Sequence, residues 1–467
     1  MKKKISRRKF LGQSACSGLS LAGLVSTMGT LRLFNASLSA QTPQPDYKAL
    51  VCLFMYGGND ANNMFIPYDI ESYNNYQAAR GILALPRENL LPLTVSNAEA
   101  GLEYAFHPNM GLLQSVFNSG KAAVVGNVGT LVAPLTKAEY QSGGAAVPPY
   151  LFSHNDQQVQ WQTSVPDSPK KVGWGGRLSD LLATLNSGSQ ISMNVSLAGN
   201  NFFQVGGESF QYHVTPQGSL GLINYDETWQ PNPPMYQAMS DNLGQSYSHL
   251  FEAEYAQVLN RAISNDTLLK SVLAGIPEYT DKFPNAVDAQ GGLTPIAGQL
   301  RMILRMIDAR AALGMHRQIY FCAMGGFDTH DDQLDDHDAL MHVFSDAVHD
   351  FYQATVDLGY SQEVTLFTAS DFNRTFSTNG KGSDHAWGSH QLVVGGAVDG
   401  GKLYGNMPMY QIGGPDDTGS RGSWIPTTSV DEYSATLAKW FGVSENDMSM
   451  VLPNIGRFAY QDLGFML

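Results

Sequence analysis

The stretch KALVCLFMYGGND, residues 48–60, decides the fold, because an apolar run of strand length ends in two glycines and then in Asp60. Two further apolar runs, RQIYFCAMGGFD and EVTLFTASD, end at Asp328 and Asp371. If the three runs are strands of one parallel sheet, their carboxylates gather at its C-terminal edge, where open α/β sheets place their ligands. A metal ion is the simplest reason for several aspartates to converge, so we predict a metal site at that edge.

Strand and helix signals alternate along the chain, which predicts an α/β fold with a mostly parallel sheet. About 420 residues follow the first forty, and this is more than one simple core usually holds. We therefore expect one large α/β domain over residues 46–467, with an insertion or lid at about 200–292. Cys52 and Cys322 lie inside predicted strands and are predicted to be buried thiols.

Residues 1–40 have the layout of an export signal. Three lysines precede the motif SRRKFL, an uncharged stretch follows, and small residues cluster near residue 40. The twin arginines predict export of the folded protein through the twin-arginine route to the periplasm or the cell exterior. A membrane anchor is the alternative, but four glycines and four serines dilute the stretch 10–31. We expect cleavage of the signal and no stable membrane span afterwards.

The chain is acidic, with 28 Lys and Arg against 42 Asp and Glu and a formal charge of −14. Residues 1–40 contain seven basic and no acidic residues, so their removal leaves about −21. This charge argues against nucleic acid or anionic lipid as a partner and is compatible with divalent cations. Gly-x-Gly-x-x-Gly, Cys-x-x-Cys and Gly-x-Ser-x-Gly are absent from the sequence, which disfavours dinucleotide, iron–sulfur and serine-hydrolase chemistry.

The first two aspartates have neighbours that could share an ion. Asn59 precedes Asp60, and two more asparagines follow, although such residues are also common in ordinary turns. His330 lies two residues after Asp328, so imidazole and carboxylate could bind one metal together. The alternative for the acidic residues that follow is the start of a helix, where carboxylates complement the helix dipole.

The third aspartate, Asp371, is followed by Arg374 and by a glycine-rich loop that contains His385 and His390. Two histidines shortly after the last of three converging strands indicate further metal ligands. The planar guanidinium of Arg374 could hold an anionic group, and a structural ion pair with one of the many acids is equally open.

An ordered set of motifs covers nearly the whole chain: after the signal come GGND, FHPNMGLL, SHNDQQVQW, GWGGRL, GGFDTHDDQ, SDFNRT and DHAWGSH. With these motifs the chain resembles the exported bacterial family called Domain of Unknown Function 1501. That family is similar to the alkaline phosphatase and sulfatase superfamily, in which strand-end aspartates and later histidines bind one or two divalent metals. The resemblance implies a three-layer α/β/α, alkaline-phosphatase-like fold.

The same resemblance implies roles for the ligand candidates. Asp60, Asp328 and Asp371 match the superfamily's strand-end aspartates, and His385 or His390 matches its late histidine. We expect Asp60 and Asp371 to share one ion, and Asp328 with the histidines to hold a second. The ion would be Ca²⁺, Mg²⁺, Mn²⁺ or Zn²⁺, with carboxylates favouring the first three and histidines favouring zinc.

A serine is the nucleophile that the resemblance implies. Ser153 occupies the comparable place at a helix start, with His154 beside it, and Arg374 would neutralise charge on the transferring group. The alternative for Ser153 is a capping hydroxyl for the following helix. Phe372 departs from the superfamily pattern, since a histidine is expected at its position.

These residues predict metal-assisted hydrolysis of a phosphate or sulfate ester, with a small anionic ester or a sulfated or phosphorylated polymer as the substrate. A non-catalytic, exported, metal-containing binding protein on the same scaffold is the alternative. A third hypothesis, an exported redox enzyme, follows from the twin-arginine route alone and has no cofactor motif to support it.

Overall fold

The structure is a computed structural model that describes residues 46–169, 171–222 and 233–467. The predicted export signal, residues 1–40, lies outside the described residues. Within the part of the chain that is described, no helix combines the length and the apolar character needed to cross a bilayer.

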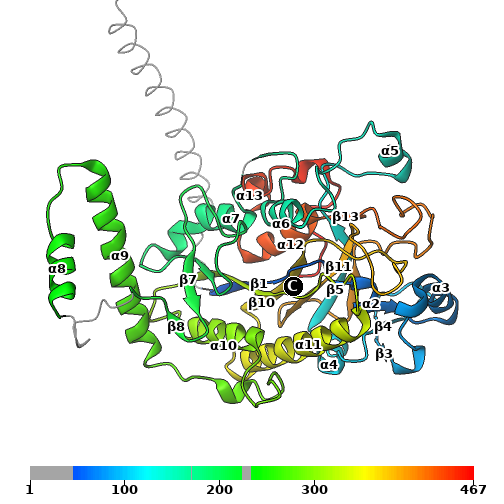
Figure 1. The fold of residues 1–467 in the computed structure, drawn as a ribbon, viewed down its shortest axis with the longest axis horizontal. Helices are drawn as coiled ribbons and strands as arrows, with labels where there is room; N and C mark the ends of the chain where they lie inside the picture. The colour runs from blue at the N-terminus through cyan, green and yellow to red at the C-terminus, as the bar shows by residue number, and fades with distance from the viewer. Residues whose placement is uncertain (1–45, 170, 223–232) are drawn as a thin grey trace, which may run out of the picture.

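The three strands predicted from the sequence lie side by side at the centre of one sheet (Figure 1). β1 (Lys48–Met55) pairs in parallel with β10 (Val364–Ser370) on one side and with β9 (Arg317–Met324) on the other. The register places the last residues of the three strands opposite one another. The three aspartates that follow the strands therefore start from the same edge, as the sequence predicted.

The central sheet has ten strands and is mostly parallel. The seven outer strands are β5 (Ala122–Gly129), β6 (Asn194–Ser196), β7 (Tyr212–Thr215), β8 (Gly218–Ser219), β11 (Ser389–Gly395), β12 (Lys402–Tyr404) and β13 (Thr428–Ser429). The order is β12-β5-β11-β10-β1-β9-β6-β7-β8, with β13 also paired to β5. Among the described strands of this sheet, β11 and β8 run antiparallel to their neighbours.

Helices cover both faces of the sheet, which confirms the predicted three layers (Figure 1). One face is covered by α4 (Gly111–Asn118), α10 (Pro295–Asp308) and α11 (Gln333–Asp357), and the other by α6 (His154–Thr163), α7 (Trp174–Leu182), α12 (Val430–Phe441) and α13 (Met448–Val451). From Ala49 to Met55, alternate side chains of β1 enter the two cores, and all are buried. Burial on both faces is why residues 49–55 form a continuous apolar run. Cys52 and Cys322 are buried free thiols, as predicted.

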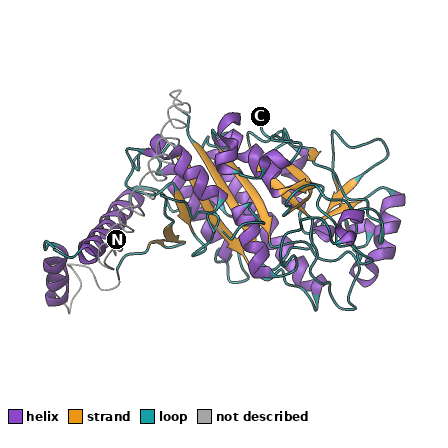
Figure 2. Cartoon of the chain, turned by 90° about the horizontal axis from the view of Figure 1, so that it is seen from above, coloured by secondary structure: helices purple, strands orange, loops and turns teal. Residues whose placement is uncertain are grey.

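The remaining elements lie around this body. A small sheet joins β2 (Phe65–Pro67), β4 (Tyr104–Phe106) and β3 (Leu91–Pro92), next to the short helices α2 (Ala61–Met64) and α3 (Ile70–Arg80). α5 (Lys137–Ser142) lies in the loop that leads to α6. Near β7 and β8, the helices α8 (Pro233–Leu243) and α9 (Leu250–Leu273) form a hairpin that projects from the body (Figures 1 and 2).

Asp431, in the first turn of α12, makes the stability of the fold depend on pH. Burial raises the pKa of its carboxyl to about 7. Because the native state then holds a proton that the unfolded chain releases, the free energy of unfolding should fall as pH rises from about 4 to about 7. Between pH 4 and pH 8, the free energy of unfolding of Asp431→Asn should rise by about 2–4 kcal/mol relative to that of the wild type. Denaturant unfolding at both pH values measures this difference, and parallel pH profiles would contradict it.

Candidate metal centre

The turns after β1 and β9 pack directly against each other. Gly57, which follows β1, has a φ of 115°, and a Cβ atom there would stand 2.4 Å from the amide nitrogen of Asp328. Only glycine fits this position. The amide of Gly57 also donates to the Asp371 carboxylate at 3.2 Å. Gly57 therefore allows the ends of three strands to meet.

α6 brings His154 to the same edge. The Nδ1 atom of His154 lies 2.7 Å from Asp371 Oδ2, and Gln158, one turn later on α6, donates to the same oxygen at 3.0 Å. A carboxylate only accepts, so Nδ1 carries a proton and, in the neutral ring, Nε2 presents a lone pair. The hydrogen bond to Asp371 raises the pKa of His154 above its ordinary value, and burial opposes this rise.

Two other histidines are oriented in the same way. The Nδ1 atom of His385 lies 2.8 Å from the carbonyl oxygen of Phe152, and that of His330 lies 3.3 Å from Asp384 Oδ1. Both partners are acceptors, so each neutral ring presents its Nε2 lone pair. Burial lowers the pKa of His385, which favours its neutral form.

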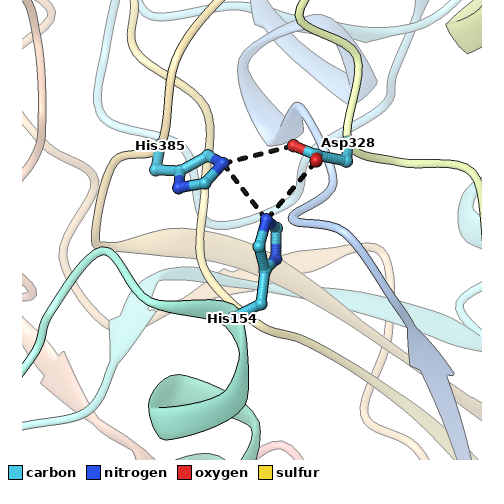
Figure 3. Close-up of side chains that lie close together, drawn as sticks. All are labelled: His154, Asp328 and His385. Atoms are coloured by element: carbon cyan, nitrogen blue, oxygen red, sulfur yellow. Dashed lines mark hydrogen bonds and ion pairs between the residues drawn. The ribbon is translucent and has the colours of Figure 1, made fainter.

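The three Nε2 atoms converge beside Asp328; Figure 3 shows two of the histidines with the carboxylate. His385 Nε2 lies 3.1 Å from that of His154 and 3.0 Å from that of His330. Asp328 Oδ1 lies 3.2 Å from His385 Nε2 and 3.1 Å from His330 Nε2, and Oδ2 lies 3.5 Å from His154 Nε2. We call these four residues the histidine–aspartate cluster.

A metal ion fits the histidine–aspartate cluster better than a shared proton. One proton can bridge only one of the two Nε2–Nε2 contacts and leaves the other pair of lone pairs facing each other. Nitrogen ligands at about 2.0–2.1 Å from a tetrahedral ion stand roughly 3.3 Å apart, close to the observed spacing. Within the described residues, His154, Asp328 and His385 form the group of three or more potential ligands whose donor atoms all lie within 4.8 Å of one another, and His330 lies beside this group.

Arg374 fixes the carboxylate of the cluster. Its buried guanidinium donates from Nη1 to Asp328 Oδ1 at 2.8 Å and from Nη2 to the carbonyl of Ser383. Burial of Asp328 opposes its ionisation, but the hydrogen bond and the charge of Arg374 lower its pKa below the ordinary value. Of the two roles that the sequence left open for Arg374, the structure shows the ion pair.

One side of the cluster is closed and the other is open to solvent. The buried ring of Phe372 has its centroid 4.8 Å from that of His154 and 4.5 Å from that of His385. The residue that departs from the superfamily pattern thus forms an apolar floor. The four side chains of the cluster are between 22% and 46% exposed, so a small molecule can reach them.

Asp60 and Asn59, two predicted ligands, lie outside the cluster. Asp60 and Arg80 are both fully buried, and Arg80 donates to Asp60 Oδ2, as does Gln333. Because Arg80 ends α3, this ion pair ties α3 to the segment after β1. Asn59 accepts a hydrogen bond of 3.1 Å from His337 Nε2. Both side chains thus contact protein groups.

His390 is also separate from the cluster. It lies in β11, is fully buried, and burial lowers its pKa to about 3. Its Nδ1 accepts a hydrogen bond of 3.1 Å from the Asn127 amide, and its Nε2 lies 2.9 Å from the Tyr410 hydroxyl. A neutral imidazole with both nitrogens occupied inside a sheet is structural, so of these two histidines His385 is the one that lies in the cluster.

Ser153, the predicted nucleophile, immediately precedes α6 in the N-cap position. Its hydroxyl donates to Asp156 at 2.6 Å and makes no capping bond to the helix amides. Its neighbour His154 is the residue that enters the cluster. Asp371, predicted as a direct ligand, orients His154 through the hydrogen bond described above.

Sequence reasoning missed Gln158 and the carbonyl of Phe152, and it gave His154 only a role beside Ser153. Gln158 had a usable signal, because residues four apart on a helix share a face and His154 precedes it by four. The backbone carbonyl of Phe152 had none, since any residue type supplies that atom.

Replacing Asp371 by asparagine should lower divalent-metal affinity by about 10–100-fold, the usual effect of losing a carboxylate behind a ligating histidine. The amide oxygen is a weaker acceptor for His154 Nδ1–H and leaves the ring less firmly oriented. Competition with a chromophoric chelator measures the affinity. Asp350→Asn, which changes a buried carboxylate bound to Asn285, is the matched control. Equal affinities for Asp371→Asn and wild type would contradict the orienting role.

Three solved structures are similar to the described fold over most of its length. The lipoteichoic acid synthase LtaP from Listeria monocytogenes is 8% identical, the match covers 88% of this chain and 76% of that chain, and the TM-score is 0.36. The PsFucS1 sulfatase from Pseudoalteromonas sp. is 9% identical, with coverages of 89% and 72% and a TM-score of 0.34. The phosphonate monoester hydrolase SpPMH from Silicibacter pomeroyi is 7% identical, with coverages of 85% and 74% and a TM-score of 0.33. At these values the likeness carries no conclusion about the activity of this chain. No curated protein matches the sequence.

A family model matches residues 47–417, a span that contains the whole histidine–aspartate cluster and every motif from GGND to DHAWGSH. The match confirms the family that these motifs predicted, and the chain belongs to the family described as "Protein of unknown function (DUF1501)".

Proposed function

We propose that this chain is a divalent-metal-dependent hydrolase of phosphate or sulfate esters, with one ion held by His154, His385 and Asp328 and with His330 beside it. One observation carries the proposal: three Nε2 atoms and a carboxylate converge, and each histidine is oriented by an acceptor on Nδ1. An imidazole-rich donor set favours Zn²⁺ over Ca²⁺, Mg²⁺ and Mn²⁺, which prefer oxygen ligands.

A divalent ion bound there would lower the pKa of a coordinated water and polarise an ester oxygen. The protein's own residues prepare the site for this chemistry. Asp371 and Asp384 hold two of the imidazoles in orientation, Arg374 keeps Asp328 ionised, and Phe372 excludes water from one side. The exposure of the cluster supports catalysis, since catalytic sites keep an open position and structural sites are closed.

Cationic side chains near the cluster support an anionic substrate. Arg421 pairs with Asp384 and is 46% exposed, and Lys381, close to Asp331, is 73% exposed. In a chain with this many acids, these two cations reduce the local repulsion of a phosphate or sulfate group. A small anionic ester or the end of a sulfated or phosphorylated polymer fits this setting. The proposal includes export through the twin-arginine route, on the basis of residues 1–40.

A non-catalytic metal-binding protein is the second candidate, and one observation favours it. The Ser153 hydroxyl and the Arg374 guanidinium, the side chains predicted to act on the ester, are both bound to protein groups. In that case the open cluster would bind an anion without cleaving it.

Metal removal distinguishes the two candidates. Protein spanning residues 41–467 should be purified, analysed for metal, stripped with a chelator, and assayed on aryl phosphates and aryl sulfates before and after Zn²⁺ or Mn²⁺ is restored. The hydrolase proposal expects about one ion per chain and turnover that disappears and returns with the ion. Bound metal without turnover would favour the binding protein. Turnover in fully metal-free protein would overturn the proposed mechanism.

A further inference from the structure

α9 carries a row of exposed apolar side chains. Phe251, Tyr255 and Val258 are 78%, 68% and 49% exposed, and the exposed Ala262 continues the row. Steps of four, three and four residues place all four side chains on one face of the helix. This is the spacing of the seam between two packed helices, and the described residues leave it facing water. We call these four residues the α9 row.

The α9 row lies on a hairpin that stands away from the sheet (Figures 1 and 2). α9 has 24 residues, and of these Ala256, Leu269 and Leu273 are buried, so its contact with the body is mainly through its last turns. Between α8 and the first half of α9 is a cavity of about 480 Å³, lined by apolar side chains that include Met239, Leu243, Phe251 and Tyr255. A long apolar face beside an open apolar cavity on a projecting element marks an interaction surface.

We propose that the α9 row pairs with the α9 row of a second copy of this chain, antiparallel, in a symmetric dimer. With the two-fold axis midway between residues 256 and 257, Phe251 lies opposite Ala262 of the second copy and Tyr255 lies opposite Val258. Each layer then sets a large side chain against a smaller one, which fills space evenly. Parallel pairing would instead set Phe251 against Phe251 and Tyr255 against Tyr255.

The charges beside the row agree with the antiparallel arrangement. Glu254 and Arg261 are 58% and 66% exposed and lie 3.5 Å apart along the edge of the row. From the two-fold axis, Glu254 is displaced by about 4 Å along the helix and Arg261 by about 7 Å in the opposite direction. Glu254 of one copy and Arg261 of the other therefore come within side-chain reach, twice per dimer. Such flanking pairs set the partner and the orientation of packed helices.

Sedimentation velocity of residues 41–467, from about 1 to about 100 μM, tests the proposal. We expect a dimer that dissociates on dilution. Phe251→Asp with Val258→Asp should be monomeric over the whole range while remaining folded, because both side chains are exposed in the single chain. Gln257→Asp, on the same helix but outside the row, is the matched control and should remain dimeric.

Charge reversal provides a second, independent readout. Arg261→Glu should weaken the dimer by about tenfold or more, and adding Glu254→Arg should restore it, since the pairs across the two-fold axis are then rebuilt with opposite signs. A wild-type protein that stays monomeric to about 100 μM would overturn the proposal. A dimer that survives both the aspartate variant and Arg261→Glu would overturn it as well.

Discussion

The variant His154→Ala is expected to bind divalent metal more than about 100-fold more weakly than the wild type, because even residues behind the ligands contribute about 10–100-fold. The change removes one Nε2 donor and also leaves the buried Asp371 carboxylate without its imidazole partner. Metal content after dialysis, measured by mass spectrometry, and competition with a chromophoric chelator give stoichiometry and affinity.

His342→Ala is the matched control for this variant. His342 lies on α11 with a 63% exposed side chain near Asp346 and has no part in the cluster. Its loss should leave metal content and affinity unchanged. If His154→Ala kept the metal content and affinity of the wild type, the cluster would not be the metal centre, and the proposed function would lose its supporting observation.

The variant Asp60→Ala is expected to lower the free energy of unfolding by about 3–5 kcal/mol and to leave the metal content unchanged. The cost arises because Arg80 would remain fully buried without its carboxylate. Desolvating an unpaired guanidinium is far more unfavourable than losing an exposed ion pair. Denaturant unfolding, combined with metal analysis of the same samples, measures both quantities.

A double variant provides the control for Asp60. Asp60→Ala with Arg80→Met removes both charges, and apolar replacement of a buried pair is often close to neutral, so most of the stability should return. Loss of metal from Asp60→Ala with little loss of stability would contradict this prediction. It would restore Asp60 to the ligand role predicted from the sequence and would separate that role from the ion pair.

The sheet could be predicted because burial of a strand on both faces can be read from its residue types. β1, β9 and β10 are covered on both faces, which requires apolar side chains at nearly every position. In each strand the apolar run ends where the strand reaches the edge of the sheet. The same reasoning identified Asp328, His330 and His385 as candidates, because they follow strands in chain order. His154 comes from a helix start far from them in sequence, and its approach depends on how α6 packs on the sheet.

The sequence by itself determined the family, the parallel sheet and the edge at which the aspartates lie. Only the tertiary structure decided which side chains face one another there. Asp60 turns to Arg80 because a buried carboxylate needs a cation, and the nearest one is at the end of α3. The Asp371 carboxylate binds His154 Nδ1, whereas the carboxylate that lies next to His154 Nε2 in the cluster is that of Asp328. Strand position is a matter of local burial, whereas the direction of a buried carboxylate depends on partners that the chain brings from far away.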